Sequence, residues 1–333
     1  MQWGLTMELG SDDEGRRLDR VLRKALKDLP LSAIHRALRK GDIRVDGKRQ
    51  SPDYRCRRGD RIECRIHGPG LAGAFPARDA HEQPIHDRPH AFPAIIHEDD
   101  FLLFVNKPQG QLVHGSTDSL DEEVRRYLRG RLPHSISFVP GPLHRLDRNS
   151  SGLLCFSKSL EGAVRFSAAL KSGKVHKTYL ALLEGRIAGG HRWEDRLLRG
   201  ADMRSSVLPA DASEASAGKA KTASLDIVGV AGTDDHSLAL IRLHSGRTHQ
   251  IRVQSAHHGF PLAGDVKYGA SRRNFPYFLH AFRLSFGTRL YKELPTSLEA
   301  AIPEKFLEII EKTFSFPAEE VYSIIRQTNF PGG

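Results

Sequence analysis

The sequence has few cysteines and no long apolar run. Its 333 residues include three cysteines, Cys56, Cys64 and Cys155, and none of them forms a C-x-x-C pair. An odd and sparse set of thiols is typical of a reducing compartment, and it argues against a disulfide framework or a structural zinc site. No run approaches the ~18 apolar residues that a membrane-spanning helix needs. The sequence therefore predicts a protein without a membrane span.

Basic side chains are missing from the first fifteen residues. This segment carries Glu8, Asp12, Asp13 and Glu14 but no Lys or Arg, whereas a secretory signal begins with positive charge. The composition, 39% hydrophobic and 27% charged, is globular. The length suggests about two domains. We expect a soluble, cytoplasmic protein.

The positive charge is concentrated near the N-terminus. The formal net charge is +10, and residues 14–67 hold 17 Lys and Arg against 8 Asp and Glu. Nearly all the excess therefore lies in this short segment. Such a concentration favours a module that binds a polyanion, nucleic acid above all. A solvated basic face is the alternative.

The pattern within 14–67 predicts two short helices and a small sheet. Apolar residues recur at helical spacing over 18–29, and Pro30 stops the helix. A second helix is expected to begin with Ser32 as its N-cap and to end at Gly41. An alternating strand at 43–45 then leads into a two-residue Asp-Gly hairpin turn.

This arrangement resembles the alpha-L RNA-binding motif, which occurs in a small-subunit ribosomal protein and in many RNA-modifying enzymes. The resemblance implies that the module binds structured RNA, and the alternative is a small basic cap on a larger domain. The candidate RNA-binding residues are Arg36, Arg39, Lys40 and Arg44.

Residues 68–92 are rich in Pro and Gly and read as a linker. The segment 68–73 spells G-x-G-x-x-G, but a dinucleotide site needs a strand before the glycines and a helix opening within them. A Pro-rich stretch offers no such helix. The template of a P-loop also fails, because Arg49 follows Lys48 where Ser or Thr should stand.

Regular structure is expected after the linker. Helical patterns at 120–128 and 159–171 alternate with apolar runs, and further strands follow one another directly. This order predicts a mixed, largely antiparallel sheet with helices packed on it, an α/β fold of the α+β type, over residues 93–290. A helical extension over 291–333 completes the chain. The predicted strands are 101–105, 152–156, 179–183, 225–230 and 238–243, and the extension's helices are 304–313 and 318–326.

Candidate chemistry is concentrated in two stretches. In the first, residues 141–152, Asp147 stands close to Arg145 and Arg148 just before a predicted strand. Nearby positive charge favours an ionised carboxylate that can act as a nucleophile or base, although a loop-anchoring ion pair is the commoner use of such a pattern. The second stretch, 244–253, reads H-S-G-R-T-H-Q-I-R-V.

Other chemistries fit less well. Histidines 244, 249, 257 and 258 lack metal-ligand spacing, so no metal is expected. Ser150 and Ser151 lie near a His and an Asp, but the G-x-S-x-G motif of a hydrolase is absent. A glycosidase would usually need two carboxylates around one bond, and only Asp147 is well placed.

Two long motifs carry a more specific signal. The run H-R-L-D-R-N-S-S-G resembles the signature of the RluA-type pseudouridine synthase family. The run G-R-T-H-Q-I-R-V, followed by G-x-P-L-x-G-D-x-x-Y-G, resembles the second signature of that family. The resemblance covers about 93–286, and an alpha-L motif in front of such a domain also occurs in the family.

The resemblance implies a role for each matching position. Asp147 would attack the target uridine, so that the base detaches, rotates and rejoins through carbon 5. Arg252 would pair with this aspartate, and Tyr179 would stack on the flipped base and move a proton at carbon 5. Ile251 would lie under the uracil, and Arg145 would fill the gap left by the extruded nucleotide. Contacts with phosphate, or a part in fixing the loop, are expected for Lys107, Arg148 and Lys177.

The implied function is the isomerisation of specific uridines in structured RNA, 23S ribosomal RNA in the first place. The reaction needs no cofactor, and the protein is expected to act as a monomer without a protein partner. Three alternatives stay open at this point. They are transfer RNA as the substrate, a non-catalytic ribosome-assembly protein that binds RNA, and a glycosidase acting on nucleosides.

Overall fold

A computed structural model describes residues 5–65, 92–200, 204–209, 218–287 and 289–330. These residues fall into two compact units. The first combines the N-terminal residues with 124–141 and 157–163, and the second holds 93–123, 142–156 and the residues from 164 onward. The linker predicted at 68–92 lies outside the described residues except for its last position.

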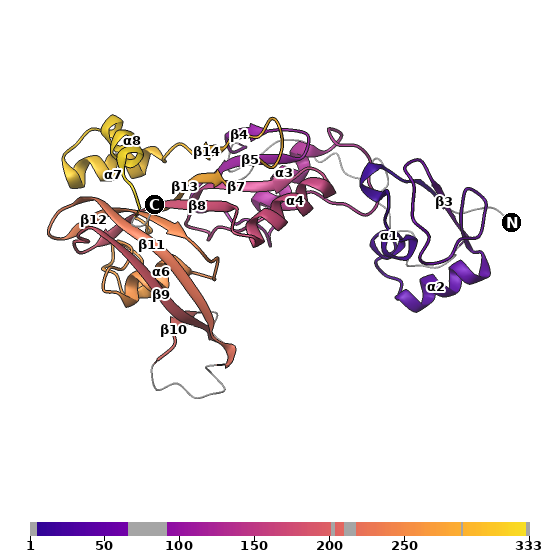
Figure 1. The fold of residues 1–333 in the computed structure, drawn as a ribbon, viewed down its shortest axis with the longest axis horizontal. Coiled ribbons are helices and arrows are strands. Elements are labelled where there is room, and N and C mark those ends of the chain that lie inside the picture. Colours follow the sequence, from indigo (N-terminus) through magenta and orange to yellow (C-terminus); the bar gives the residue numbers. More distant parts are fainter. Residues whose placement is uncertain (1–4, 66–91, 201–203, 210–217, 288, 331–333) are drawn as a thin grey trace. The chain divides into compact units, whose positions relative to one another are not determined.

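The N-terminal module contains a small sheet and two helices (Figure 1). Its strands pair antiparallel in the order β1–β3–β2. The predicted Asp-Gly turn is confirmed, since Asp46 and Gly47 have φ of 49° and 72° and Val45 bridges to Lys48. The elements are β1 (Leu5–Glu8), η1 (Ser11–Asp13), α1 (Leu18–Ala25), α2 (Leu31–Lys40), β2 (Ile43–Val45) and β3 (Arg61–Cys64).

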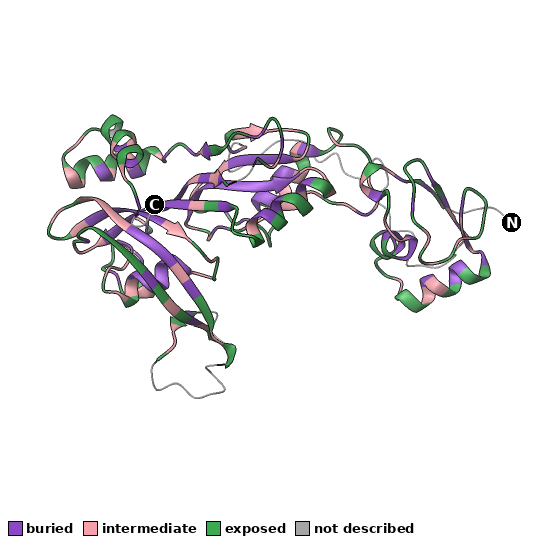
Figure 2. Ribbon diagram, viewed as in Figure 1, coloured by how far each residue is buried: buried purple, intermediate pink, exposed green. Residues whose placement is uncertain are grey.

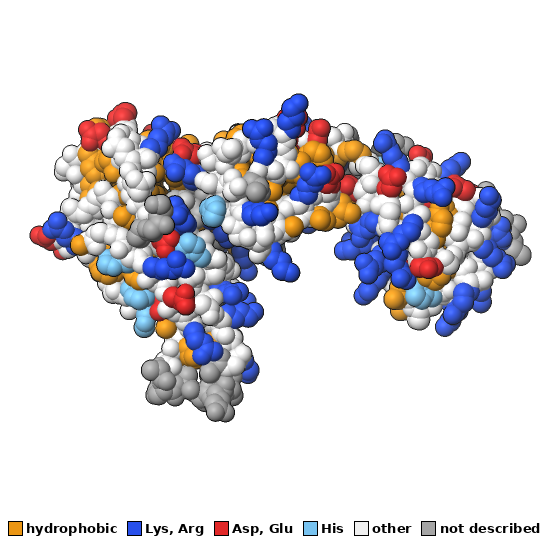
Figure 3. All heavy atoms as spheres, in the orientation of Figure 1, with side chains coloured by type: hydrophobic (Ala, Val, Ile, Leu, Met, Phe, Trp, Pro, Cys, Tyr) orange, Lys and Arg blue, Asp and Glu red, His pale blue; other side chains and the backbone are white. Residues whose placement is uncertain are grey.

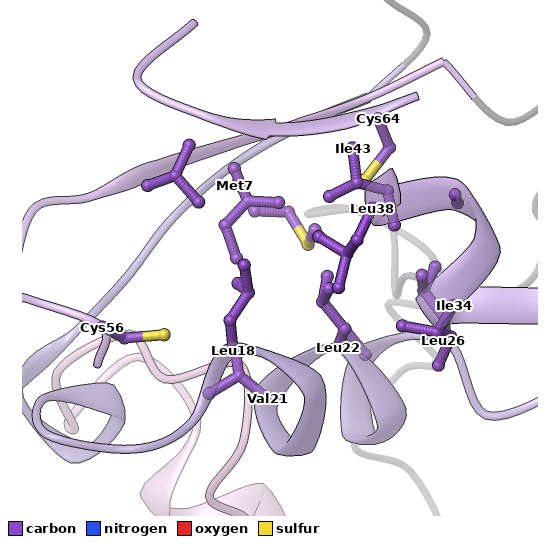
Figure 4. Packing of buried hydrophobic residues seen from close by; sticks show 14 of the residues in the cluster. Met7, Leu18, Val21, Leu22, Leu26, Ile34, Leu38, Ile43, Cys56 and Cys64 are labelled. Carbon is purple, nitrogen blue, oxygen red and sulfur yellow. The ribbon is translucent and has the colours of Figure 1, made fainter. Parts of the chain in front are cut away.

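The apolar faces of α1 and α2 meet the sheet in a core of their own (Figure 4). Leu18, Leu22, Ile34 and Ile43 are fully buried there. Burying each such side chain contributes about 1.5–3 kcal/mol. The cysteines of the chain are free and buried rather than joined in disulfides, as their number predicted.

Two predicted helix boundaries in this module are wrong. The first helix ends at Ala25, because Leu26 leaves helical geometry with ψ of 62° while its side chain still enters the core. The second begins at Leu31 with Pro30, not Ser32, as its N-cap. The Pro30 carbonyl accepts from the amides of residues 33 and 34, and an N-cap needs no N–H of its own.

The second unit is built on one large sheet. Its strands lie in the order β10–β9–β11–β12–β8–β13–β7–β5–β4, with β14 on β13 and β6 on β7. Among the described pairs with a register, β13 with β7 is parallel and the others are antiparallel, which confirms the predicted mixed, largely antiparallel sheet. The strands are β4 (Ile95–Glu98), β5 (Leu102–Lys107), β6 (Gly141–Pro142), β7 (Ser151–Ser157), β8 (Val175–Glu184), β9 (Gly190–Arg199), β10 (Ser205–Val207), β11 (Lys221–Gly232), β12 (His236–Leu243), β13 (Leu279–Phe286) and β14 (Ser297–Glu299).

Helices on both halves of the unit bury apolar side chains against this sheet (Figure 2), as α4 and α7 show. Phe166 of α4 packs with β5 and β7, and Phe306 and Ile310 of α7 pack with β8 and β12. No helix among the described residues is long and apolar enough to cross a membrane. The helices are α3 (Leu120–Leu128), α4 (Leu160–Lys171), α6 (Gln250–His257), η2 (Val266–Tyr268), α7 (Glu304–Phe314) and α8 (Ala318–Gln327).

Gly152 allows β7 to pair with β13 and so positions the loop in front of β7. Its φ is 108°, and a Cβ there would lie 2.3 Å from the carbonyl oxygen of Ala281. Only glycine fits so close a backbone approach. The S-S-G end of the first motif is therefore required by packing, and it fixes where Asp147 lies.

Candidate active site

A cavity of about 470 Å³ opens in the second unit beside the loop before β7. It brings together six of the eight side chains predicted for catalysis and substrate binding, although they come from distant parts of the chain. These are Arg145, Asp147, Lys177, Tyr179, Ile251 and Arg252. Arg148 lines an adjoining hollow of about 270 Å³ together with Arg145, Asp147 and Arg252.

The predicted pairing of Asp147 with Arg252 is present. One terminal nitrogen of Arg252 donates to Oδ2 of Asp147 at 3.3 Å. The side chain of Asp147 is 19% exposed and that of Arg252 is 8% exposed. A carboxylate in this position is paired with a cation and can still be reached from the cavity.

Arg252 is held mainly by a second carboxylate, that of Asp265. The Nε and Nη2 atoms of Arg252 donate to the two oxygens of Asp265 at 2.6 and 2.8 Å, and Asp265 is buried. Burial alone would lower the pKa of Arg252, but the hydrogen bonds and charge of Asp265 raise it above its ordinary value. The bidentate pair fixes the plane of the guanidinium, so that its remaining nitrogen faces Asp147.

Two tyrosine rings also contact the guanidinium of Arg252. The guanidinium carbon lies 4.5 Å from the ring centre of Tyr277 and 4.8 Å from that of Tyr268. Such cation–π contacts favour a planar cation over an ammonium. Asp265, Tyr268 and Tyr277 were given no role from the sequence. The first two stand in the G-D-x-x-Y-G part of the second motif, which was the available signal.

Tyr179 of β8 and Ile251 of α6 form an apolar part of the cavity wall. They are 6% and 3% exposed. Burial, helped by the charge of Asp147, raises the pKa of Tyr179, so its hydroxyl keeps its proton at neutral pH. The cavity thus has an aromatic ring and an aliphatic side chain in its wall, and stacking of a base on them stays a prediction.

Lys177, also on β8, places an ammonium in the same cavity, and burial lowers its pKa. A Cβ on Gly246 would lie 3.3 Å from Nζ of Lys177. The glycine of the second motif therefore leaves room for this lysine. The contact of Lys177 with phosphate stays a prediction.

Lys107 has the contacts of a residue that fixes the loop. It is fully buried, and its Nζ donates to the carbonyl oxygens of Pro108, Arg148 and Ser150 at 2.8, 3.1 and 2.7 Å. Burial lowers its pKa to about 7. Of the two roles expected for Lys107, phosphate binding would require the ammonium to leave all three carbonyls.

The loop of Asp147 is also tied down from Gln109 and Gly110. Gln109 donates to the carbonyl of Asn149, and the amide of Gly110 donates to that of Arg148. In turn, Nε of Arg148 donates a hydrogen bond of 2.9 Å to the carbonyl oxygen of Gly110. The N-K-P-Q-G segment after β5 thus supports the loop that carries Asp147.

The four histidines considered for metal lie near three different carboxylates. His244 pairs with buried Asp226 at 2.7 Å, and His258 pairs with Asp195 at 3.1 Å, with His257 4.0 Å from the same side chain. His249 differs, since its Nε2 lies 3.9 Å from Oδ2 of Asp147. Its Nδ1 lies 2.7 Å from the hydroxyl of Tyr268.

In the N-terminal module, the predicted RNA-binding residues Arg36, Arg39 and Lys40 are exposed on α2. Arg44 is half-buried and donates to the carbonyls of Gly41 and Gly47. Basic side chains also gather around α1 (Figure 3), where they line a hollow of about 950 Å³. These additional residues, which were counted but not singled out from the sequence, are Arg16, Arg20, Arg23, Lys24 and Lys27.

Comparisons with known proteins find matches for both parts of the chain. Residues 101–257 match the family model of RNA pseudouridylate synthase, and residues 16–62 match that of the S4 domain. "Ribosomal large subunit pseudouridine synthase C" of Vibrio vulnificus is 30% identical over 92% of this chain and 95% of its own length. The Escherichia coli K12 protein of the same name is 32% identical over 78% of each chain.

The chain belongs to the RNA pseudouridylate synthase family. Members of this family are isomerases, as the motifs implied. The fold agrees, because the structure of human RNA pseudouridylate synthase domain containing 1 aligns with a TM-score of 0.54 at 24% identity, covering 74% of this chain and all of that one. Asp147, Tyr179 and Arg252 of this pseudouridine synthase fall inside the matched segment, whereas Asp265 and Tyr268 follow it.

Proposed function

We propose that this pseudouridine synthase isomerises specific uridines of large-subunit ribosomal RNA, with Asp147 as the nucleophile. The observation that carries the proposal is the Asp147–Arg252 pair at the wall of a cavity that Tyr179 and Ile251 also line. The names of the Vibrio and Escherichia relatives support ribosomal RNA as the substrate.

In the proposed reaction, the target nucleotide leaves its helix and enters the cavity. Unstacking a base costs a few kcal/mol, and Arg145, an exposed planar cation at the cavity rim, offsets part of this cost by filling the vacated space. Tyr179 and Ile251 then hold the two faces of the uracil. Lys177 and Arg148 are placed to meet the flanking phosphates.

Asp147 attacks the nucleotide, and the bond between the sugar and N1 of the uracil breaks. The base rotates in the cavity and rejoins the sugar through carbon 5. A proton leaves carbon 5, N1 gains one, and Asp147 is released, so atoms and charge balance without a cofactor. Arg252 keeps Asp147 ionised and aimed throughout, because Asp265 and the two tyrosine rings hold the guanidinium in place.

The N-terminal module supplies affinity for the RNA rather than chemistry. The phosphates of the RNA are contacted by Arg36, Arg39, Lys40 and Arg44. The basic residues around α1 extend this surface. The protein acts as a monomer without a protein partner. A ribosomal RNA substrate places it in the cytoplasm.

The test uses the purified full chain with two RNA substrates, a large-subunit ribosomal RNA transcript and a pool of unmodified transfer RNA. Carbodiimide treatment and primer extension map pseudouridine in each. We expect modification at one or a few positions of the ribosomal RNA only. Modification confined to transfer RNA would overturn the substrate assignment. Binding without modification of either RNA would favour an assembly protein, and release of free uracil would indicate a glycosidase.

A further inference from the structure

His249 contacts the nucleophile, but no step of the proposed reaction uses it. It is the residue before α6, and its backbone lies in the left-handed region with φ of 55° and ψ of 23°. This conformation is uncommon for a residue other than glycine, and it persists only where the surroundings impose it. The side chain lines both the large cavity and the adjoining hollow.

The hydrogen bonds around Tyr268 favour one tautomer of His249. The backbone N–H of Ser205 in β10 donates to the Tyr268 hydroxyl oxygen at 3.4 Å. The hydroxyl hydrogen is then free to be donated to Nδ1 of His249, 2.7 Å away. This arrangement favours the tautomer with the proton on Nε2, which is the nitrogen closer to Asp147.

The opposite tautomer is disfavoured at the other end of the imidazole. With the proton on Nδ1, a lone pair on Nε2 would face the carboxylate of Asp147 at 3.9 Å. Burial lowers the pKa of His249, although Asp147 and Asp265 act against this while Arg252 and Lys267 favour it. Burial also raises the pKa of Tyr268. Both directions favour a neutral imidazole beside a protonated hydroxyl.

The hydrogen bond from Arg252 and the approach of His249 involve the same oxygen of Asp147. Arg252 lies 3.3 Å and His249 3.9 Å from Oδ2. No group in the described part of the chain bonds to Oδ1. One oxygen of the carboxylate is therefore approached by two side chains, and the other has no donor among the described residues.

We propose that His249 is a positioning residue that holds Oδ2 of Asp147 together with Arg252 and so presents Oδ1 as the attacking oxygen. The inference rests on the proposed role of Asp147 as the nucleophile. Tyr268 orients the imidazole, and strand β10 orients Tyr268 through the amide of Ser205. The chain of contacts runs from the sheet edge to the reacting atom.

The first arm of the test needs no activity. The full chain is labelled with ¹⁵N-histidine, and long-range ¹H–¹⁵N correlation spectra report the tautomer of each ring at neutral pH. The His249 signals are assigned by their loss in H249N. We expect the Nε2–H tautomer in the wild type and a mixture of tautomers in Y268F. An Nδ1–H tautomer, or an imidazolium that Y268F leaves unchanged, would overturn the proposal.

The second arm separates the contact with Asp147 from the backbone strain. Asn adopts the left-handed conformation readily but is too short to reach Asp147. Gln is long enough to present an amide N–H near the position of Nε2. At saturating RNA, we expect the single-turnover rate of H249N to fall about 10- to 100-fold, that of H249Q to recover part of this loss, and RNA affinity to stay within a few-fold.

H257N is the matched control, because His257 is the last residue of α6, at the end opposite His249, and its side chain is 51% exposed. We expect its rate to equal that of the wild type. H249N at the wild-type rate, or H249Q no faster than H249N, would refute the positioning role. A wild-type protein that modifies no RNA would instead refute the proposed function. The tautomer measurement would still show whether Tyr268 orients His249 toward Asp147.

Discussion

Arginine serves two different purposes in the two units of this protein. Arg36 and Arg39 lie exposed on α2 of the N-terminal module, where charge alone is useful. Arg252 is buried, with carboxylates at 2.6 and 3.3 Å and aromatic rings against its faces. The exposed arginines contribute long-range attraction for a polyanion, whereas the buried one contributes geometry. Replacing an exposed arginine should therefore change mainly RNA affinity, whereas replacing the buried one should change mainly rate and stability.

The largest effect is expected for the nucleophile itself. Asp147→Asn removes the charge but keeps the shape of the side chain, so the modification rate should fall below about one-thousandth of the wild-type value. RNA affinity should stay within a few-fold, because the exposed cations of the N-terminal module are unchanged. Single-turnover kinetics and filter binding measure the two quantities. Asp234→Asn, at a side chain 97% exposed, is the control. An equal loss of rate and affinity would contradict the separate roles of Asp147 in the reaction and of the N-terminal module in RNA binding.

The buried arginine should differ sharply from an exposed one in stability. Arg252→Met leaves the buried carboxylate of Asp265 without its partner, and the free energy of unfolding should fall by about 3–5 kcal/mol. Arg39→Met makes the same exchange on the surface of α2, where the change should stay within about 0.5 kcal/mol. Urea denaturation compares the two variants. A similar loss of unfolding free energy in both variants would show that the contacts around Arg252 do not stabilise the fold.

Acid should weaken the second unit through a buried histidine. His280 lies between Ser151 and the carbonyl of Ala300, and burial lowers its pKa to about 4. The unfolded chain, with an ordinary value near 6.5, binds the proton first. Stability is therefore complete above about pH 6.5 and falls as the pH drops toward 4, by about 3 kcal/mol. Calorimetry across this range should show the decline, with a shallower one in His280→Asn. Equal slopes would remove His280 as the cause.

The smallest effect is expected for the exposed cations. Replacing Arg36, Arg39 and Lys40 by Ser should weaken RNA binding and lower the slope of log affinity against log salt by about two. The rate at saturating RNA should equal that of the wild type, because none of the three lines the cavity. Binding titrations at several salt concentrations test this. A lower rate at saturation would place α2 closer to the chemistry than proposed.

Regular elements with one clear pattern could be predicted from the sequence. The helix 120–128 has the predicted bounds, and 160–171 and 304–314 differ from prediction by one residue. Strand β9 was missed because, among its ten residues, Trp193 and Leu197 alone are buried, so no alternation is visible. Strand β13 was missed because a buried His280 and a half-buried Arg283 interrupt its apolar residues. Which strands pair with β9 and β13 cannot be predicted from the local sequence either.

The site was predicted from motifs, and its supports were not. Asp147 and Arg252 lie 105 positions apart, and their pairing was inferred from a resemblance rather than from spacing. Asp265 was given no role from the sequence, although it is the main partner of Arg252. His249 was weighed as a metal ligand because residue type alone carries no direction. The left-handed backbone that aims its side chain becomes visible only in the fold.

The central claim is that this chain makes pseudouridine through Asp147. It is tested most directly by carbodiimide mapping of total RNA from cells with and without the gene, complemented by the wild type or by Asp147→Asn. The account predicts that one or a few signals in large-subunit ribosomal RNA vanish in the deletion and return with the wild type only. An unchanged map, or signals restored by Asp147→Asn, would contradict it.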